Sequence, residues 1–166
     1  MVIDRASEKK KIYALLEQVC DPEIPVLSIL DLGIVRDVSF QEDHLEITIT
    51  PTYTGCPAMD MIEVEIKAIL QENNYEKVKV KTILSPAWTT DWLTESGKEK
   101  LLAYGIAPPK GKAKSKRALF AEADEIACPQ CKSENTEMVS QFGSTACKAQ
   151  YRCKDCQEPF DYFKCH

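Results

Sequence analysis

The stretch "LEITITPTYTGCPAMDMIEVEIKAIL", residues 45–70, predicts a strand, a turn and a helix in succession, which decide the fold of the first part of the chain. Its first six residues alternate between apolar and polar, which is typical of a strand with one buried face. From Pro57 to about Asn73, apolar residues recur at helical spacing. Those expected in the core are Met61, Ile62, Ile66, Ile69 and Leu70. A cysteine, Cys56, lies in the turn between the two elements.

Cys56 is expected at or near the N-cap of this helix, because Pro57 suits the first helical position. Free backbone N–H groups and the helix dipole favour a negative charge there. Gly55 lets the backbone turn beside the sulfur. We therefore predict a thiol that ionises more easily than usual, and so a better nucleophile and metal ligand. A small residue that packs in a turn is the alternative, and these residues alone leave both interpretations open.

The flanking sequence completes a small α+β domain. Residues 7–19 have an amphipathic pattern with Ser7 as the expected N-cap, and the prolines that follow end this helix. The remaining predicted elements are a hairpin of strands over residues 33–40 and 44–50, a strand over 77–83, and a helix over 90–105 that ends at Gly105. The order α-β-β-α-β-α predicts a small mixed sheet with helices on one face.

The loop "DPEIPVLSILDLGIV", residues 21–35, is unusually rich in apolar residues and contains Asp21, Glu23 and Asp31. One interpretation is a docking surface, or an acidic site beside Cys56. The other is a buried connection in which Asp31 caps a turn, and the residues alone favour this second interpretation.

Two Cys-x-x-Cys motifs near the end of the chain predict a metal site. "CPQC" supplies Cys128 and Cys131, and "CKDC" supplies Cys153 and Cys156, with 21 residues between the motifs. Two such knuckles present four thiolates to one tetrahedral ion. The intervening residues predict a hairpin, and residues 158–164 a third strand, so we expect an all-β zinc ribbon that needs its metal to fold. Iron suits the same four-cysteine cage and remains an alternative.

Three further thiols are candidates for packing. Cys20 directly follows the end of the first helix and is expected to pack. If the strands that flank the second knuckle pair with each other, Cys147 and Cys165 lie close together and about 20 Å from the metal, too far to be ligands. Core thiols are the favoured interpretation of this pair. A second site with His166 or a redox pair are the alternatives.

The chain is expected to form two domains joined by a linker. Residues 1–106 form the first domain, 107–122 a basic, proline-containing linker, and 123–166 the ribbon. The run from Lys110 to Arg117 holds five positive charges. The other residues hold 16 basic and 26 acidic side chains, a balance of −10. We therefore favour a solvated linker over a nucleic-acid-binding segment.

Composition argues against several other classes. The net charge of −5 indicates no general attraction to nucleic acid or to an anionic membrane. We find neither an apolar signal core nor an apolar run of membrane-spanning length, so a cytoplasmic protein is expected. His44 and His166 are isolated in the sequence and do not form a catalytic constellation. In a reducing compartment, eight cysteines favour metal binding or thiol chemistry over disulfides.

Several stretches also resemble a known family. "DPEIPVLSILDLGIVRDV" (21–38) and "TPTYTGCPAMDMI" (50–62) resemble the small domain shared by SufT-type proteins and the targeting factor of cytosolic iron–sulfur assembly. "LSPAWTTDWLTESGKEKLLAYGIAPP" (84–109), followed by the two knuckles, narrows the resemblance. Nearly the whole chain resembles the PaaD (PaaJ) family, the D component of the bacterial phenylacetyl-CoA epoxidase system.

The resemblance implies a role in aerobic phenylacetate degradation. The epoxidase of that system is a multicomponent di-iron monooxygenase, whose reductase carries flavin and an iron–sulfur cluster. The D component is expected to be a non-catalytic accessory protein that helps to assemble or insert a cluster, with the reductase as its partner. Cys56 matches the functional thiol of related proteins and Asp21, Glu23 and Asp31 match acidic positions, so iron or a transient cluster is expected to pass through this site.

Three function classes follow. The first is this accessory protein, the second is a structural subunit of the epoxidase, and the third is a nucleic-acid-binding ribbon. Whether the chain works as a homodimer stays open.

Overall fold

The computed structural model describes residues 5–110 and 126–164, and its contacts divide the chain into two compact units, Met1–Trp88 and Thr89–His166. None of the described helices is both long and apolar enough to cross a bilayer. The fold class is the expected one, an α+β unit with a mixed sheet and a second unit built on an antiparallel ribbon.

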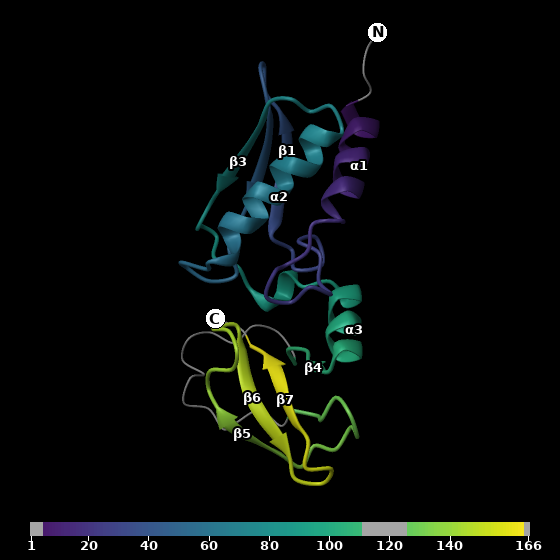
Figure 1. Cartoon of the computed structure of the whole chain (residues 1–166), viewed down its shortest axis with the longest axis vertical. Coiled ribbons are helices and arrows are strands. Elements are labelled where there is room, and N and C mark those ends of the chain that lie inside the picture. The colour runs from purple at the N-terminus through teal and green to yellow at the C-terminus, as the bar shows by residue number, and fades with distance from the viewer. Residues whose placement is uncertain (1–4, 111–125, 165–166) are drawn as a thin grey trace. The chain divides into compact units, whose positions relative to one another are not determined.

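The first unit contains two helices and a three-stranded sheet (Figure 1). In chain order its elements are α1 (Arg5–Leu16), β1 (Val35–Phe40), β2 (Leu45–Ile49), α2 (Ala58–Glu72) and β3 (Val78–Thr82). The strand order is β1-β2-β3, with β1 antiparallel and β3 parallel to β2. Figure 1 shows α1 and α2 together on one side of the sheet, as predicted.

The core of this unit follows the predicted periodicities, with two exceptions. On β2 the apolar residues are buried, and on α2 the buried stripe is Ala58, Ile62, Ile66 and Leu70. Met61, expected in the core, is 55% exposed, because it lies about 100° around the helix from this stripe. Ser7 was expected to cap α1, but the helix already begins at Arg5.

The parallel pairing of β2 and β3 fixes the position of the Cys56 turn. Ile49 at the end of β2 pairs with Thr82 at the end of β3, and the Ile83 N–H donates to the Ile49 carbonyl at 2.9 Å. Both strands therefore end at the same edge of the sheet. The chain leaves β2 at this edge, passes Cys56 and enters α2.

The second unit is larger than the expected ribbon. Its elements are η1 (Thr90–Trp92), α3 (Glu95–Tyr104), β4 (Ile106–Ala107), β5 (Thr136–Ser140), β6 (Lys148–Cys153) and β7 (Pro159–Phe163). The hairpin β5–β6 and the third strand β7 are those predicted from the sequence. Gly105 ends α3 in a left-handed conformation (φ 90°), as predicted, and the Thr94 hydroxyl caps its start.

The position of the division between the units differs from the predicted one. Strand β4 pairs in parallel with β7, so the second sheet has the order β4-β7-β6-β5, and Ala107 is a buried strand residue, not part of a linker. A two-residue strand has no sequence signature of its own, which explains the difference. Most of the predicted linker, residues 111–125, lies outside the described residues.

The apolar loop between α1 and β1 is a buried connection. Ile24, Leu27 and Ile29 are almost fully buried, and the Trp88 indole N–H donates to the Leu32 carbonyl at 2.7 Å. This hydrogen bond ties the loop to the end of the first unit.

We predict that Trp88→Phe lowers the free energy of unfolding of the first unit by about 1–2 kcal/mol, because the buried Leu32 carbonyl loses its indole donor. Urea unfolding followed by circular dichroism measures the effect. Trp92→Phe removes the other tryptophan, in the second unit, and is the control. Equal stability of Trp88→Phe and the parent chain would contradict the assigned role of the bond.

Candidate functional site

The four knuckle cysteines converge on one point in the second unit. The Sγ atoms of Cys128, Cys131, Cys153 and Cys156 all lie within 4.8 Å of one another. The closest cross-knuckle pairs are Cys131–Cys153 at 3.5 Å and Cys128–Cys156 at 3.7 Å. Tetrahedral zinc with Zn–S bonds of about 2.3 Å requires sulfur separations of about 3.8 Å. The fold therefore brings the four predicted ligands together at a spacing that fits a single tetrahedral ion.

The electrostatics of this cluster favour a bound cation. The Cys156 N–H donates to the sulfur of Cys153 and is the main reason why the pKa of Cys153 falls to about 7. The Glu158 N–H lowers the pKa of Cys156, but burial and the neighbouring sulfurs outweigh it and raise that pKa to about 12. Four adjacent thiolates therefore require a positive charge between them.

The two knuckles have the same backbone conformation. Lys132 (φ 65°) and Gln157 (φ 66°) each follow the second cysteine of a knuckle and adopt the left-handed region. The Cys128 N–H donates to Ser133 O and the Cys153 N–H to Glu158 O, five residues later in both cases. Sequence reasoning missed these left-handed positions, because lysine and glutamine do not mark them as glycine does.

Accessibility differs among the four ligands. Cys128 and Cys153 are fully buried in a core cluster with Tyr151 and Phe160, whereas Cys131 is exposed and Cys156 is half-buried. The first cysteine of each knuckle is thus anchored in the core, and the second faces outward.

Cys56 is the second candidate site. Helix α2 begins at Ala58 with Pro57 as its N-cap, so Cys56 lies one residue before the cap. Its side chain is mostly buried, with 8% of the residue exposed. The Ala58 N–H and the Tyr53 hydroxyl hydrogen-bond to its sulfur. Tyr53 is a site residue that sequence reasoning missed, and no motif marks it.

The predicted lowering of the Cys56 pKa is wrong. Burial raises the pKa of this thiol, and the negative charges of Glu23 and Asp21 raise it further. The hydrogen bonds from Ala58 and Tyr53 oppose this shift but are outweighed. The sequence argument considered only the helix start and omitted the desolvation imposed by the tertiary fold.

The structure places two of the three predicted acidic residues near Cys56. Asp21 and Glu23 both act on the charge of the thiol. The Asp21 carboxylate also holds its own loop, accepting hydrogen bonds from Glu23 N at 2.7 Å and Ile24 N at 2.9 Å. Asp31 holds a turn, as the alternative interpretation expected: its carboxylate accepts from Ser28 N at 3.1 Å.

The other thiols have local contacts. Cys20 is half-buried, and its thiol lies 3.9 Å from Gln18 O. Cys147 is buried, its sulfur lies 3.0 Å from Thr145 Oγ1, and its carbonyl accepts from Lys164 N. Cys165 and His166 lie outside the described residues, so the predicted proximity of Cys147 and Cys165 stays a prediction.

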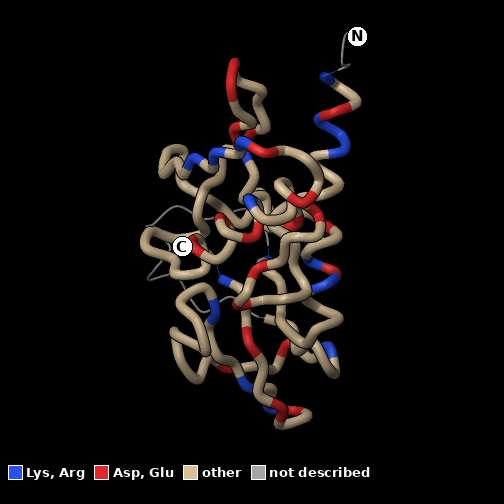
Figure 2. Tube along the Cα trace, turned by 45° about the horizontal axis from the view of Figure 1, so that its top comes forward, with Lys and Arg blue, Asp and Glu red and all other residues tan. Residues whose placement is uncertain are grey.

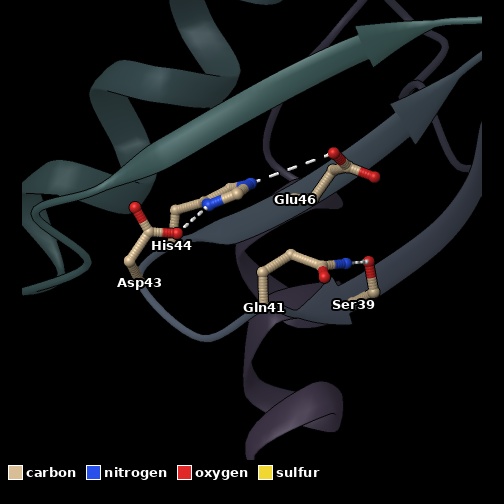
Figure 3. Close-up of polar contacts among 5 residues, drawn as sticks. All are labelled: Ser39, Gln41, Asp43, His44 and Glu46. Carbon is tan, nitrogen blue, oxygen red and sulfur yellow. Dashed lines mark hydrogen bonds and ion pairs between the residues drawn. The ribbon is translucent and has the colours of Figure 1, made fainter.

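His44 lies at the β1–β2 hairpin, between two carboxylates (Figure 3). Its Nδ1 is 2.6 Å from Asp43 Oδ1, and its Nε2 is 3.9 Å from Glu46 Oε2. The contact with His44 holds the pKa of Asp43 below its usual range. Because the hairpin turn precedes β2 and Cys56 follows it, His44 is at the other end of the strand from the candidate thiol.

We predict that the alkylation rate of Cys56 rises with pH around a midpoint above the ordinary cysteine value of about 8.5. Glu23→Gln should lower this midpoint, because it removes a negative charge that opposes the thiolate. Mass spectrometry of the peptide that carries Cys56 gives the rates.

Glu42→Gln is the matched control, because Glu42 precedes β2 and is separated from Cys56 by the whole strand, about 17 Å long. A midpoint below 8.5, or an equal response to both variants, would contradict the assigned cause.

Comparisons with known proteins agree with this two-part architecture. A family model described as an iron-sulfur cluster assembly protein matches residues 9–82, and one described as the PaaD zinc beta ribbon domain matches residues 112–164. Over 58% of this chain and 92% of the other, the fold matches the crystal structure of a domain of unknown function (DUF59) from Bacillus anthracis, with TM-score 0.54 and 33% identity.

Curated relatives match either the first unit or nearly the whole chain. The "Fe-S protein maturation auxiliary factor YitW" of Bacillus subtilis (strain 168) is 39% identical over 100 residues, covering 59% of this chain and 94% of that protein. The D component of the "Putative 1,2-phenylacetyl-CoA epoxidase" of Escherichia coli (strain K12) is 49% identical over 156 residues, covering 93% of this chain and 92% of that protein. This chain therefore belongs to the PaaD family, the family of the D component of phenylacetyl-CoA epoxidase.

Proposed function

We propose that this protein is a non-catalytic accessory component of the multicomponent phenylacetyl-CoA 1,2-epoxidase of aerobic phenylacetate degradation. It assists the assembly or insertion of the iron–sulfur cluster of the reductase component. The observation that carries the proposal is the setting of Cys56, a hydrogen-bonded thiol beside Glu23 and Asp21, within a domain that matches the iron–sulfur assembly family.

The raised pKa gives this thiol a specific chemistry. In the absence of a cation the thiol stays protonated, which limits its reaction with oxidants, since the thiolate is the reactive form. The carboxylates of Glu23 and Asp21 that disfavour the thiolate also attract a cation. When iron or a cluster arrives as cargo, the S–H bond breaks, the sulfur binds the metal, and the proton leaves.

One thiolate does not enclose a cluster, so Cys56 needs further ligands. Within the chain, the carboxylates of Asp21 and Glu23 are the nearby candidates, and Asp31 supports them by holding the same loop. Outside the chain, the further ligands come from a second copy or from the reductase. A transfer site benefits from an incomplete ligand set, because the receiving protein completes the coordination as it takes the cargo.

The metal of the ribbon is, in this proposal, zinc with a folding role. Cys128, Cys131, Cys153 and Cys156 fit it by their number and by their sulfur separations. A ribbon of about 40 residues buries too little apolar surface to fold by itself, so the metal supplies folding free energy. Iron fits the same four sulfurs and is the alternative that metal analysis distinguishes.

A structural subunit of the epoxidase is the second candidate function, and the name of the Escherichia coli relative, which describes it as a subunit, favours it. A structural subunit is needed throughout turnover, whereas an assembly protein is needed only while the reductase is loaded. Nucleic-acid binding receives less support: Figure 2 shows Lys and Arg residues interspersed with Asp and Glu residues over the described parts of both units.

We predict that Cys56→Ala preserves the fold and the ribbon metal but abolishes support of the epoxidase in cells that lack the native protein. The reductase isolated from those cells should contain little iron and acid-labile sulfide. Cys20→Ala is the matched control, because it removes a half-buried thiol from the same unit and should support full loading.

Full loading of the reductase with Cys56→Ala would assign this thiol to packing. A fully loaded reductase from cells that lack the protein altogether, with epoxidase turnover still failing, would favour the structural role.

We also predict one zinc ion per chain in the purified protein, and its loss in Cys131→Ser, with unfolding of the ribbon and a folded first unit. Elemental analysis gives the metal, and circular dichroism with limited proteolysis gives the folding state. Cys147→Ser, which changes a buried ribbon thiol outside the ligand set, should retain the metal. A ribbon that keeps its structure without metal in the presence of chelator would contradict the folding role.

A further inference from the structure

One side chain within the second knuckle joins the two halves of the metal site. Asp155 lies between the ligands Cys153 and Cys156, and its carboxylate reaches the residues that follow the first knuckle. Its Oδ2 accepts from Ser133 Oγ at 2.5 Å, and its Oδ1 accepts from Asn135 Nδ2 at 2.7 Å. Each carboxylate oxygen thus has a partner on the other knuckle.

The backbone reinforces the same connection. The Lys154 N–H donates to the Asn135 carbonyl at 2.8 Å, parallel to the side-chain contacts of Asp155. The Asn135 N–H donates to Ser133 Oγ at 3.0 Å, which orients this hydroxyl toward the carboxylate. We call Ser133, Asn135 and Asp155 the inter-knuckle clasp.

Both ends of the clasp also contact metal ligands directly. The Ser133 N–H donates to the sulfur of Cys131, and the Ser133 carbonyl accepts from Cys128 N at 2.8 Å. On the other side, the Asp155 N–H donates to the sulfur of Cys153. A displacement of either clasp residue therefore moves a ligand sulfur of its own knuckle.

We propose that the inter-knuckle clasp is a positioning element that holds the two ligand pairs at the separation required by the metal and slows metal release. The closest sulfur pairs, Cys131–Cys153 and Cys128–Cys156, both join different knuckles, so metal leaves only when the knuckles separate. Cys131 is exposed and is the ligand that a competing chelator reaches first. Ser133 binds this ligand, and Asp155 binds Ser133.

The test uses the full-length protein loaded with Zn²⁺ and measures the rate at which excess 4-(2-pyridylazo)resorcinol takes the metal. Asp155→Ala should release zinc about 10-fold faster, the lower end of the effect of residues that orient metal ligands. Asp155→Asn should remain within about 3-fold of the parent rate, because its amide oxygen still accepts one hydrogen bond and its NH₂ donates to Ser133 Oγ.

A merely structural role is distinguished by two further readouts. Glu158→Ala removes the same charge, from an exposed residue two positions beyond Cys156, and should leave the release rate unchanged. The double variant Ser133→Ala/Asp155→Ala should release zinc no faster than Asp155→Ala, because both changes remove one interaction. The ligand-field absorption of Co²⁺-loaded Asp155→Ala should shift relative to the parent protein.

Release at the parent rate in Asp155→Ala, or equal acceleration in Asp155→Ala and Glu158→Ala, would overturn the proposal. If Asp155→Ala does not fold, Ser133→Ala is measured in its place, and an unchanged rate in that variant overturns it. None of these measurements involves Cys56, so the result is independent of the proposed role in iron–sulfur assembly.

Discussion

Burial of one face of α2 against the sheet is the constraint on which the first unit depends. Ile62, Ile66 and Leu70 are fully buried, and each contributes about 1.5–3 kcal/mol relative to exposure. With the helix fixed on the sheet and β2 ending beside β3, the connecting turn crosses the edge of the sheet within a few residues. Cys56 is therefore held in a mostly buried position at this edge.

The chemistry of Cys56 reflects a competition between local and tertiary effects. The start of a helix favours an anion by about 0.3–1 kcal/mol, and the N–H of Ala58 acts in this direction. Desolvation, assisted by the nearby carboxylates, acts in the opposite direction and is larger, so the pKa rises. Such a thiol is suited to binding a cation that displaces its proton, and less suited to acting as a free nucleophile at neutral pH.

The ribbon thiols are governed by a different balance. Paired backbone N–H groups point at the sulfurs, and the four sulfurs are close enough to require a shared cation. The metal, the Tyr151 and Phe160 core and strand β4 together make up for the small size of the ribbon. The two units thus use cysteine in two ways, as a set of four converging ligands in the ribbon and as a single protonated thiol in the first unit.

The sequence by itself determined the features that depend on near neighbours in the chain. The Cys-x-x-Cys spacing places two ligands in one turn, and the alternation in β2 and the periodicity of α2 each identify an element from contiguous residues. Only the tertiary structure decided what depends on distant segments. The loop at Asp21 and Glu23, about 30 residues before Cys56 in the chain, reverses the expected pKa shift. Strand β4 joins the ribbon through β7, more than 50 residues later, and Asp155 contacts Ser133 across 22 residues. Burial and long-range pairing arise from the whole packed fold, so no local pattern contains them.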